Sequence, residues 1–170
     1  MNPTTTGFGA IRTAEAKVLV LGTLPGQVSL ARNEYYANAR NVFWRLMGDV
    51  LGVDATLPYS DRTRHLKERG VALWDVCEAA HRPGSLDGAI DHASVKPNDF
   101  AALFAACPQL QMVCFNGAKA AQLFTRRVPE EVRSSRALRY ETLPSTSPAH
   151  AAMRYEDKLA RWSILREVLE

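Results

Sequence analysis

The sequence predicts an α/β protein with a mainly parallel sheet. Short apolar segments alternate along the chain with segments whose apolar residues recur at helical spacing. That alternation is typical of parallel strands joined by crossover helices. A length of 170 residues suits one domain with a core large enough to fold without disulfides or metals.

Four segments are expected to form the strands. The first covers 18–21 and runs into the turn Gly-Thr-Leu-Pro-Gly. The second covers 71–76, and its mostly apolar composition (VALWDV) indicates a central position in the sheet. The third and fourth are expected at 111–115 and 140–143.

Helices are expected where the apolar period approaches 3.6 residues between capping and glycine signals. These segments are 41–51, 60–69, 97–108, 118–124 and 149–169. The first 12 residues are expected to form a flexible tail, followed by one domain over 13–170. A long loop is expected between 77 and 99, and such loops in compact domains are usually functional or disordered.

Composition excludes several classes of protein. No apolar run approaches the roughly 18 residues of a membrane span, and the N-terminus lacks the pattern of a signal peptide, so a cytoplasmic location is expected. The three cysteines, Cys77, Cys107 and Cys114, lack metal-site spacing and are expected to be buried apolar residues. Neither a metal nor a cofactor is expected. A net charge of +3 is only a weak indication of polyanion binding.

The turn after the first strand is the first candidate site. Gly22 and Gly26 permit close backbone approach, and Pro25 stiffens the turn. The pattern is neither a P-loop nor a dinucleotide-binding GxGxxG motif, so taken by itself the turn could be a simple connection.

Aromatic and amide side chains follow this turn: Tyr35, Tyr36, Asn38, Asn41, Phe43 and Trp44. Aromatic faces stack on bases, and amides hydrogen-bond to base edges or to a water molecule. We interpret the loop as half of a pocket for an extruded nucleobase. The alternative is that Phe43 and Trp44 belong to the core and that Asn41 only caps a helix.

Polar residues at other strand ends could supply the second half of the pocket. Asn116 follows an apolar strand and offers both a donor and an acceptor, although Asn-Gly is also a common turn pair. Asp75 could position a water molecule or cap a turn. The loop 143–151 (LPSTSPAHA) could bind DNA phosphates, or Ser147 and Pro148 could simply begin a helix.

Taken together and in order, these segments resemble the uracil-DNA glycosylase superfamily, and most closely its hypoxanthine (deoxyinosine) DNA glycosylase family. The matching segments are LGTLPGQVSL (21–30), YYANARNVFW (35–44), GVALWDVCEAAHRPGSLDGAI (70–90), FNGAKA (115–120) and LPSTSPAHA (143–151). The resemblance implies a single-domain three-layer α/β/α sandwich around a four-stranded sheet. It also implies a monomer that acts on DNA containing deaminated bases, without metal or cofactor.

The resemblance also assigns roles to residues. Asn41 would be the catalytic asparagine that orients the attacking water, and Asn116 its partner in contact with the base. The base-binding residues would be Gly22, Thr23, Leu24, Pro25, Tyr36, Phe43 and Asn116. The DNA-binding residues would be Ser29, Ser145, Thr146, Ser147, Pro148 and His150. The turn 22–25 is not followed by the Asp, Glu or Asn that several relatives carry, which argues against strong uracil excision.

The sequence therefore predicts a monofunctional DNA glycosylase that initiates base excision repair, with hypoxanthine as the first substrate and uracil as the second. The alternatives are a mismatch-type uracil or thymine glycosylase and a non-catalytic DNA-binding member of the fold. A serine hydrolase using Ser145 or Ser147 with His150 is disfavoured, because no carboxylate is placed to orient the histidine. Arginines that could hold the duplex are Arg40, Arg126, Arg127, Arg133, Arg136 and Arg139.

Overall fold

A four-stranded parallel sheet forms the centre of the computed structural model, which describes residues 3–170. Its strands are β3 (Val71–Asp75), β2 (Val18–Gly22), β6 (Met112–Asn116) and β7 (Arg139–Leu143), in that spatial order. All three neighbouring pairs run parallel. The predicted mainly parallel four-stranded sheet is confirmed.

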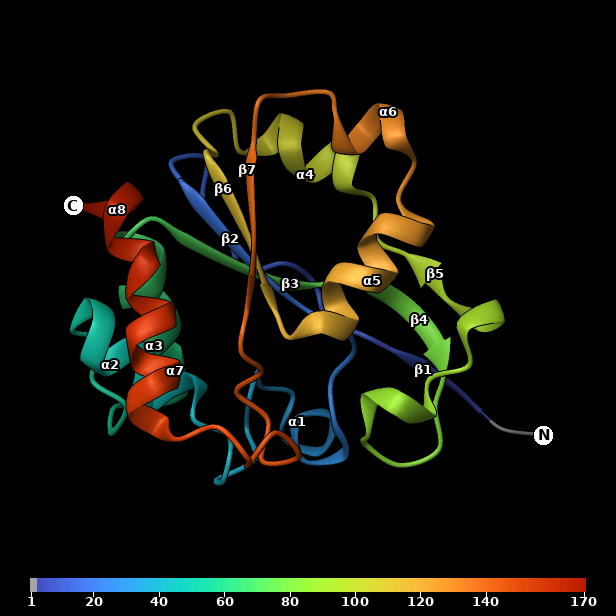
Figure 1. The fold of residues 1–170 in the computed structure, drawn as a ribbon, viewed down its shortest axis with the longest axis horizontal. Helices are drawn as coiled ribbons and strands as arrows, with labels where there is room; N and C mark the ends of the chain where they lie inside the picture. Colours follow the sequence, from blue (N-terminus) through green and yellow to red (C-terminus); the bar gives the residue numbers. More distant parts are fainter. Residues whose placement is uncertain (1–2) are drawn as a thin grey trace.

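Helices cover both faces of this sheet (Figure 1). One face carries α2 (Phe43–Leu51), α3 (Tyr59–Glu68) and α7 (Tyr155–Trp162), and the other carries α4 (Phe100–Ala106) and α5 (Ala118–Arg127). Each face has its own apolar core. The three-layer α/β/α sandwich is therefore confirmed. The shorter helices are α1 (Gln27–Arg32), α6 (Glu130–Arg133), α8 (Arg166–Leu169), η1 (Asp87–Ala89), η2 (His92–Ser94) and η3 (Ser163–Leu165).

Side chains alternate between the two cores along each central strand, as the pleat requires. In β2, Val18 and Val20 pack beneath α2, whereas Leu19 and Leu21 belong to the core on the opposite face. Because both faces are buried, the strand is apolar at every position before Gly22.

A second, antiparallel sheet forms in two segments that were predicted to be irregular, 1–12 and 77–99. It contains β1 (Thr4–Thr6), β4 (Cys77–His81) and β5 (Lys96–Pro97), in that order. The tail expected over 1–12 is thus held by strand pairing across residues 4–6, where three β-branched threonines favour extended backbone. Residues 1–2 of that expectation lie outside the described residues. The loop expected over 77–99 likewise contains two short strands and two 3-10 turns.

The predicted helix 149–169 is wrong at its start. Residues 149–154 form turns and α7 begins only at Tyr155, after Arg154 in an extended conformation. Local bonds favour the turns, because the Ala149 amide donates to Ser147 Oγ at 3.2 Å and the His150 amide to the Ser147 carbonyl at 3.0 Å. Ser147 and Pro148 therefore do not begin a helix. The short helix α1 was not expected within the polar loop.

Two further expectations concern burial and membrane association. All three cysteines are buried and reduced. Within residues 3–170, none of the helices combines the length and apolar character required to cross a bilayer.

Candidate active site

Three neighbouring strands end in Asp75, Gly22 and Asn116. Gly22 is paired with Asp75, and Asn116 follows Phe115, the register partner of Leu21. Strand alternation directs all three positions toward the face covered by α2. Since the carboxyl ends of parallel strands meet at one edge, the fold places a carboxyl and an amide on either side of a glycine.

Because Gly22 has no side chain, the side chains of Asp75 and Tyr36 can lie next to its Cα atom. A Cβ atom at this position would lie 2.6 Å from Asp75 Oδ1 and 3.2 Å from the Tyr36 hydroxyl. Both distances are too short for a carbon atom to be accommodated without movement. The glycine is therefore required by close approach, and it locates the Tyr36 hydroxyl beside the Asp75 carboxyl.

Tyr36, whose hydroxyl lies beside Gly22 and Asp75, has an unusual backbone conformation. Its backbone φ is 56°, in the left-handed region that few residues other than glycine occupy. Its ring lies on Phe43 with centroids 4.1 Å apart and planes 30° from parallel. Strained backbone of this kind persists only where the surrounding structure enforces it, and it concentrates at functional sites.

Two polar atoms at this point are buried without a hydrogen-bond partner within residues 3–170: the Tyr36 hydroxyl and Asp75 Oδ2. Burial, followed by the negative charge of Asp87, raises the pKa of Asp75 to about 7, against an opposing effect of Arg82. Burial and Asp75 also raise the pKa of Tyr36 far above its usual range, and the approaching Asn116 amide opposes them. An unpaired buried polar group is costly, so these two atoms are candidates for contact with a bound ligand or a water molecule.

Asp87 lies in η1 and contacts the turn that follows β2. Its Oδ1 accepts a hydrogen bond of 2.6 Å from the Thr23 hydroxyl. Burial raises the pKa of Asp87, whereas the Thr23 bond, Arg82 and Lys119 lower it. This bond connects the segment 82–89 to the predicted base-binding turn.

Arg82 forms hydrogen bonds to the backbone of the same turn. In the described part of the chain its guanidinium donates to backbone carbonyls: Nε to Gly84 at 3.0 Å, Nη1 to Leu24 at 3.1 Å, and Nη2 to Pro25. Leu24 and Pro25 are themselves buried. These two predicted base-binding residues therefore form the support of the pocket.

Asn116 is fixed by the loop that follows β7. Thr146 donates its amide to Asn116 Oδ1 at 2.9 Å, and Asn116 Nδ2 donates to Thr146 Oγ1 at 2.9 Å. This reciprocal pair sets the orientation of the Asn116 amide and leaves it one N–H. Thr146 is only 1% exposed and orients Asn116, and its predicted role in DNA binding stays a prediction.

Asn41 lies two residues before the start of α2, next to its N-cap Val42. Its Oδ1 accepts from the Phe43 amide at 2.9 Å, while Val42 donates its amide to the Thr146 carbonyl at 3.1 Å. The start of α2 is thereby attached to the residue that orients Asn116. Asn41 is half-buried, and Oδ1 retains a second lone pair. The N-cap of α2 is Val42, without a side-chain cap bond, so the alternative that Asn41 caps the helix is wrong. Its role in binding a water molecule stays a prediction.

A cavity of about 250 Å³ adjoins Asn41. It is lined by Arg40, Val42, Thr146, Ser147, Pro148, Ala151, Met153, Tyr155 and Lys158. Lys158 is 5% exposed, and its Nζ donates to the His150 carbonyl at 2.8 Å. Burial lowers the pKa of Lys158. Among the described residues, two cationic side chains and no carboxylate line this cavity, which suits an anion.

The other predicted residues divide between the surface and the interior. Ser145, Ser147, Pro148 and His150 lie on the loop after β7, and His150 is exposed. Ser29, by contrast, is buried, and its hydroxyl accepts from the Ala37 amide at 3.2 Å. It therefore braces the loop rather than facing solvent.

Most of the predicted duplex-holding arginines are occupied by internal bonds. Arg136 donates to four carbonyls, those of Phe104, Cys107, Pro108 and Leu110, and Arg139 bonds to two glutamates. The arginine of this set that lines the cavity beside Asn41 is Arg40.

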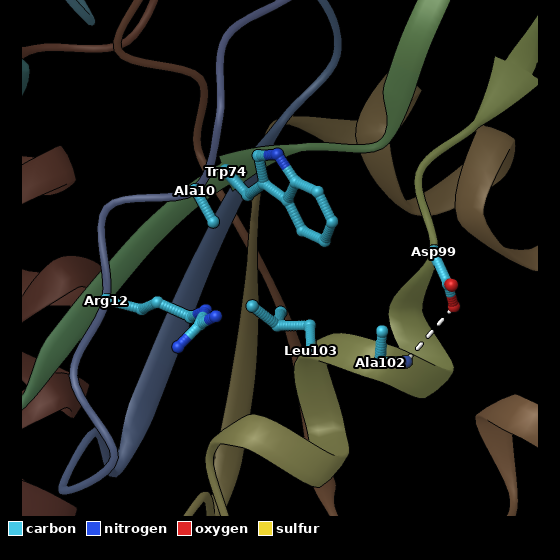
Figure 2. Close-up of a pocket in the computed structure, with 6 residues that line it drawn as sticks. All are labelled: Ala10, Arg12, Trp74, Asp99, Ala102 and Leu103. Atoms are coloured by element: carbon cyan, nitrogen blue, oxygen red, sulfur yellow. Dashed lines mark hydrogen bonds between the residues drawn. The ribbon is translucent and has the colours of Figure 1, made fainter.

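A larger cavity, of about 480 Å³, lies elsewhere (Figure 2). Its lining residues are Ala10, Arg12, Trp74, Asp99, Ala102 and Leu103, none of which is a predicted site residue. Asp99 there is occupied as the cap of α4, accepting from Ala102. For residues 3–170, no group of three or more potential ligand side chains could hold a metal ion.

Comparison with known proteins identifies the family. The model of the uracil DNA glycosylase superfamily matches residues 8–168. The chain belongs to this superfamily. The family resemblance predicted from the sequence is thereby confirmed.

Two relatives in the superfamily carry the name hypoxanthine DNA glycosylase. The one from Methanosarcina acetivorans is 37% identical over 147 residues, covering 85% of this chain and 87% of the relative. The one from Methanosarcina barkeri is 37% identical over 117 residues, covering 68% and 73%. A solution structure from M. acetivorans, provisionally named a uracil DNA glycosylase, has a TM-score of 0.82 and 30% identity over 99% of this chain and 100% of that one.

Sequence reasoning underrated several residues that the superfamily fold brings to the site. Asp75 was only an open alternative, and Asp87, Arg82 and Lys158 had no assigned role. The register of the strands could have identified Asp75, because it is the polar residue that ends VALWD. The positions of Arg82 and Lys158 depend on tertiary packing for which the sequence gives no periodic signal.

Proposed function

We propose that this superfamily member is a monofunctional DNA glycosylase that excises hypoxanthine first and uracil second from DNA. The observation that carries the proposal is the set of polar groups at the strand ends beneath Tyr36: the orphaned Asp75 carboxyl and the oriented Asn116 amide. The names of the two 37%-identical relatives support hypoxanthine as the first substrate.

The proposed reaction is hydrolysis of the N-glycosidic bond. The oxygen of a water molecule bonds to C1′ of the deoxyribose as the bond from C1′ to the base nitrogen breaks, and the bonding electron pair leaves with the base. The proton released by the water ends on the base, so the products are an abasic site and the free base. Asn41 would orient the water, and Asn116 would donate to the base as negative charge develops on it.

The aromatic pair would hold the base after flipping. Extrusion from the duplex costs a few kcal/mol, and the cost is least for a base that pairs poorly, which favours deaminated sites. Stacking against an aromatic ring offsets part of this cost. We assign this role to Tyr36, because its ring packs against Phe43 and is held in place by it.

The cavity beside Asn41 is proposed to bind a phosphate of the DNA backbone. Lys158 is a buried cation, and Arg40 makes no side-chain hydrogen bond or ion pair within the part of the chain that the structure describes. A buried charge is stabilised by a partner of opposite sign, and a phosphate supplies one. Because Arg40 and Val42 flank Asn41, such a phosphate would fix the strand next to the proposed catalytic residue.

Arg40→Gln and Lys158→Met are therefore expected each to weaken DNA binding several-fold. Each should reduce the slope of log affinity against log salt concentration by about 1, since one phosphate contact is lost. Arg64→Gln is the matched control, because Arg64 is exposed, lies outside this cavity and is paired with Asp61 at 3.0 Å; it should leave the slope unchanged. Equal slopes for all three variants and the native protein, measured by fluorescence anisotropy, would contradict the phosphate assignment.

The excision itself is tested on duplexes containing inosine, uracil or xanthine, followed by alkaline cleavage of abasic sites. Strand cleavage is expected on the inosine duplex first. Salt-sensitive DNA binding with no abasic sites on any duplex would instead support a non-catalytic role. A cytoplasmic location, a monomeric state and independence from metals are part of the same proposal; sedimentation and activity in a chelator test the last two.

A further inference from the structure

Asp75 has no role in the reaction as described so far, although its carboxyl lies at the floor of the site. It is 4% exposed, and Oδ2 lacks a hydrogen-bond partner within residues 3–170. Its other oxygen, Oδ1, lies over Gly22, 2.6 Å from the position that a Cβ atom of residue 22 would take. A buried side chain with an unpaired polar atom has a hydrogen-bonding position that a bound ligand can use.

We propose that Asp75 acts as a neutral carboxylic acid that donates a hydrogen bond to a carbonyl oxygen of the flipped base. The inference rests on the proposed excision of deaminated bases. Asp75 keeps its proton throughout, so no atom is transferred to or from it. Its partner is the lactam group, an N–H beside a C=O, which deamination creates in hypoxanthine, xanthine and uracil.

The chemistry of the leaving base requires a donor at this point. As the glycosidic bond breaks, negative charge spreads from the ring nitrogen to the carbonyl oxygen of the lactam. A donor that strengthens its bond as this charge develops stabilises the transition state more than the ground state. The neutral acid supplies such a donor, and its carbonyl oxygen can accept from the lactam N–H. An ionised carboxylate would have no donor and would repel the leaving base.

The surroundings of Asp75 favour the neutral form. Elements packed around it present five titratable groups: Tyr35 and Tyr36 from the loop before α2, Cys77 from β4, and Arg82 and Asp87 from the following segment. Arg82 is the cation among them, and its donors are directed to backbone carbonyls. The nearby Asp87 is a second acid, so two carboxyl groups share a site in which burial already disfavours charge.

The test is the pH dependence of single-turnover excision of inosine. The native protein is expected to lose activity about 30-fold between pH 6 and pH 8.5, since Asp75 with a pKa of about 7 ionises in that interval. The range stops at pH 8.5 because the lactam N–H itself ionises in more alkaline solution. Asp75→Asn, whose amide donates at every pH, should change less than threefold over the same range. Asp75→Leu should lose excision at both pH values while still binding the duplex.

The Asp87→Asn variant supplies a second test. If Asp75 had only a structural role, this substitution would not change the pH at which excision is lost. Removing the neighbouring acid lowers the pKa of Asp75, so the loss of activity should begin at a lower pH than in the native protein. Circular dichroism at each pH excludes unfolding as the cause. A native profile that is flat to pH 8.5, or an Asp75→Asn profile that falls like the native one, would overturn the inference. Absence of excision by the native protein at every pH would instead overturn the proposed function.

Discussion

Replacement of Asn41 by alanine is expected to lower the rate of excision about 10³-fold while leaving the protein folded. The loss follows if Asn41 orients the attacking water, because removing a positioned polar group from a transition state typically costs 10²- to 10³-fold or more. Folding should be affected far less. The bond from the Phe43 amide to Asn41 Oδ1 closes one local turn before α2, and a single hydrogen bond of this kind contributes about 1 kcal/mol. Single-turnover rates on an inosine duplex, together with thermal unfolding, measure both effects.

Asn38 provides a matched control three residues earlier. Its Oδ1 accepts from the Arg40 amide at 2.9 Å, in the same local geometry that Asn41 adopts with Phe43. Asn38 is exposed, however, whereas Asn41 is half-buried and its neighbour Val42 donates its amide to the Thr146 carbonyl. Asn38→Ala should therefore share the small loss of stability and retain activity. If both alanine variants lose the same small fraction of activity, Asn41 only stabilises a local turn and is not a catalytic residue.

The sequence was sufficient to predict the elements on which this site depends. Strands such as VLVLG and VALWD are apolar because both faces are covered, and that pattern is readable from composition alone. The sequence also indicated Asn116 at a strand end, Asn41 in the loop after the first strand and the loop 143–151, and the family resemblance assigned their roles. What it could not supply was the alignment of Asp75, Gly22 and Asn116, which depends on strand order and register.

Errors occurred where tertiary contacts determine local structure. The segment 149–154 is rich in alanine and should favour a helix, yet the bond from Lys158 Nζ to the His150 carbonyl and the turn at Ser147 hold it as a loop. The first residues were expected to be unstructured because nothing local orders them. They become a strand through pairing with β4, which lies more than 70 residues away in sequence.

Asp75 is also expected to make the stability of the protein depend on pH. The pKa of its carboxyl is about 7 in the folded state against 3.8 in the reference state, so between these values the folded protein holds a proton that the unfolded chain has lost. The free energy of unfolding should therefore fall as pH rises from about 4 to about 7, and this contribution should be constant above that. At about 1.4 kcal/mol for each pKa unit, the decrease is on the order of 4 kcal/mol, a large part of the stability of a typical domain.

Asp75→Asn removes the titrating group while keeping the shape of the side chain. The variant should match the native protein near pH 4 and exceed its stability by a few kcal/mol at pH 8, as measured by urea unfolding at each pH. Asp91→Asn, at an exposed carboxyl that accepts from the Ala93 amide, is the control and should leave the difference between the two pH values unchanged. A native protein as stable as Asp75→Asn at pH 8 would mean that Asp75 ionises without penalty. The site would then hold a carboxylate, which can accept from the lactam N–H but has no proton to donate to a leaving base.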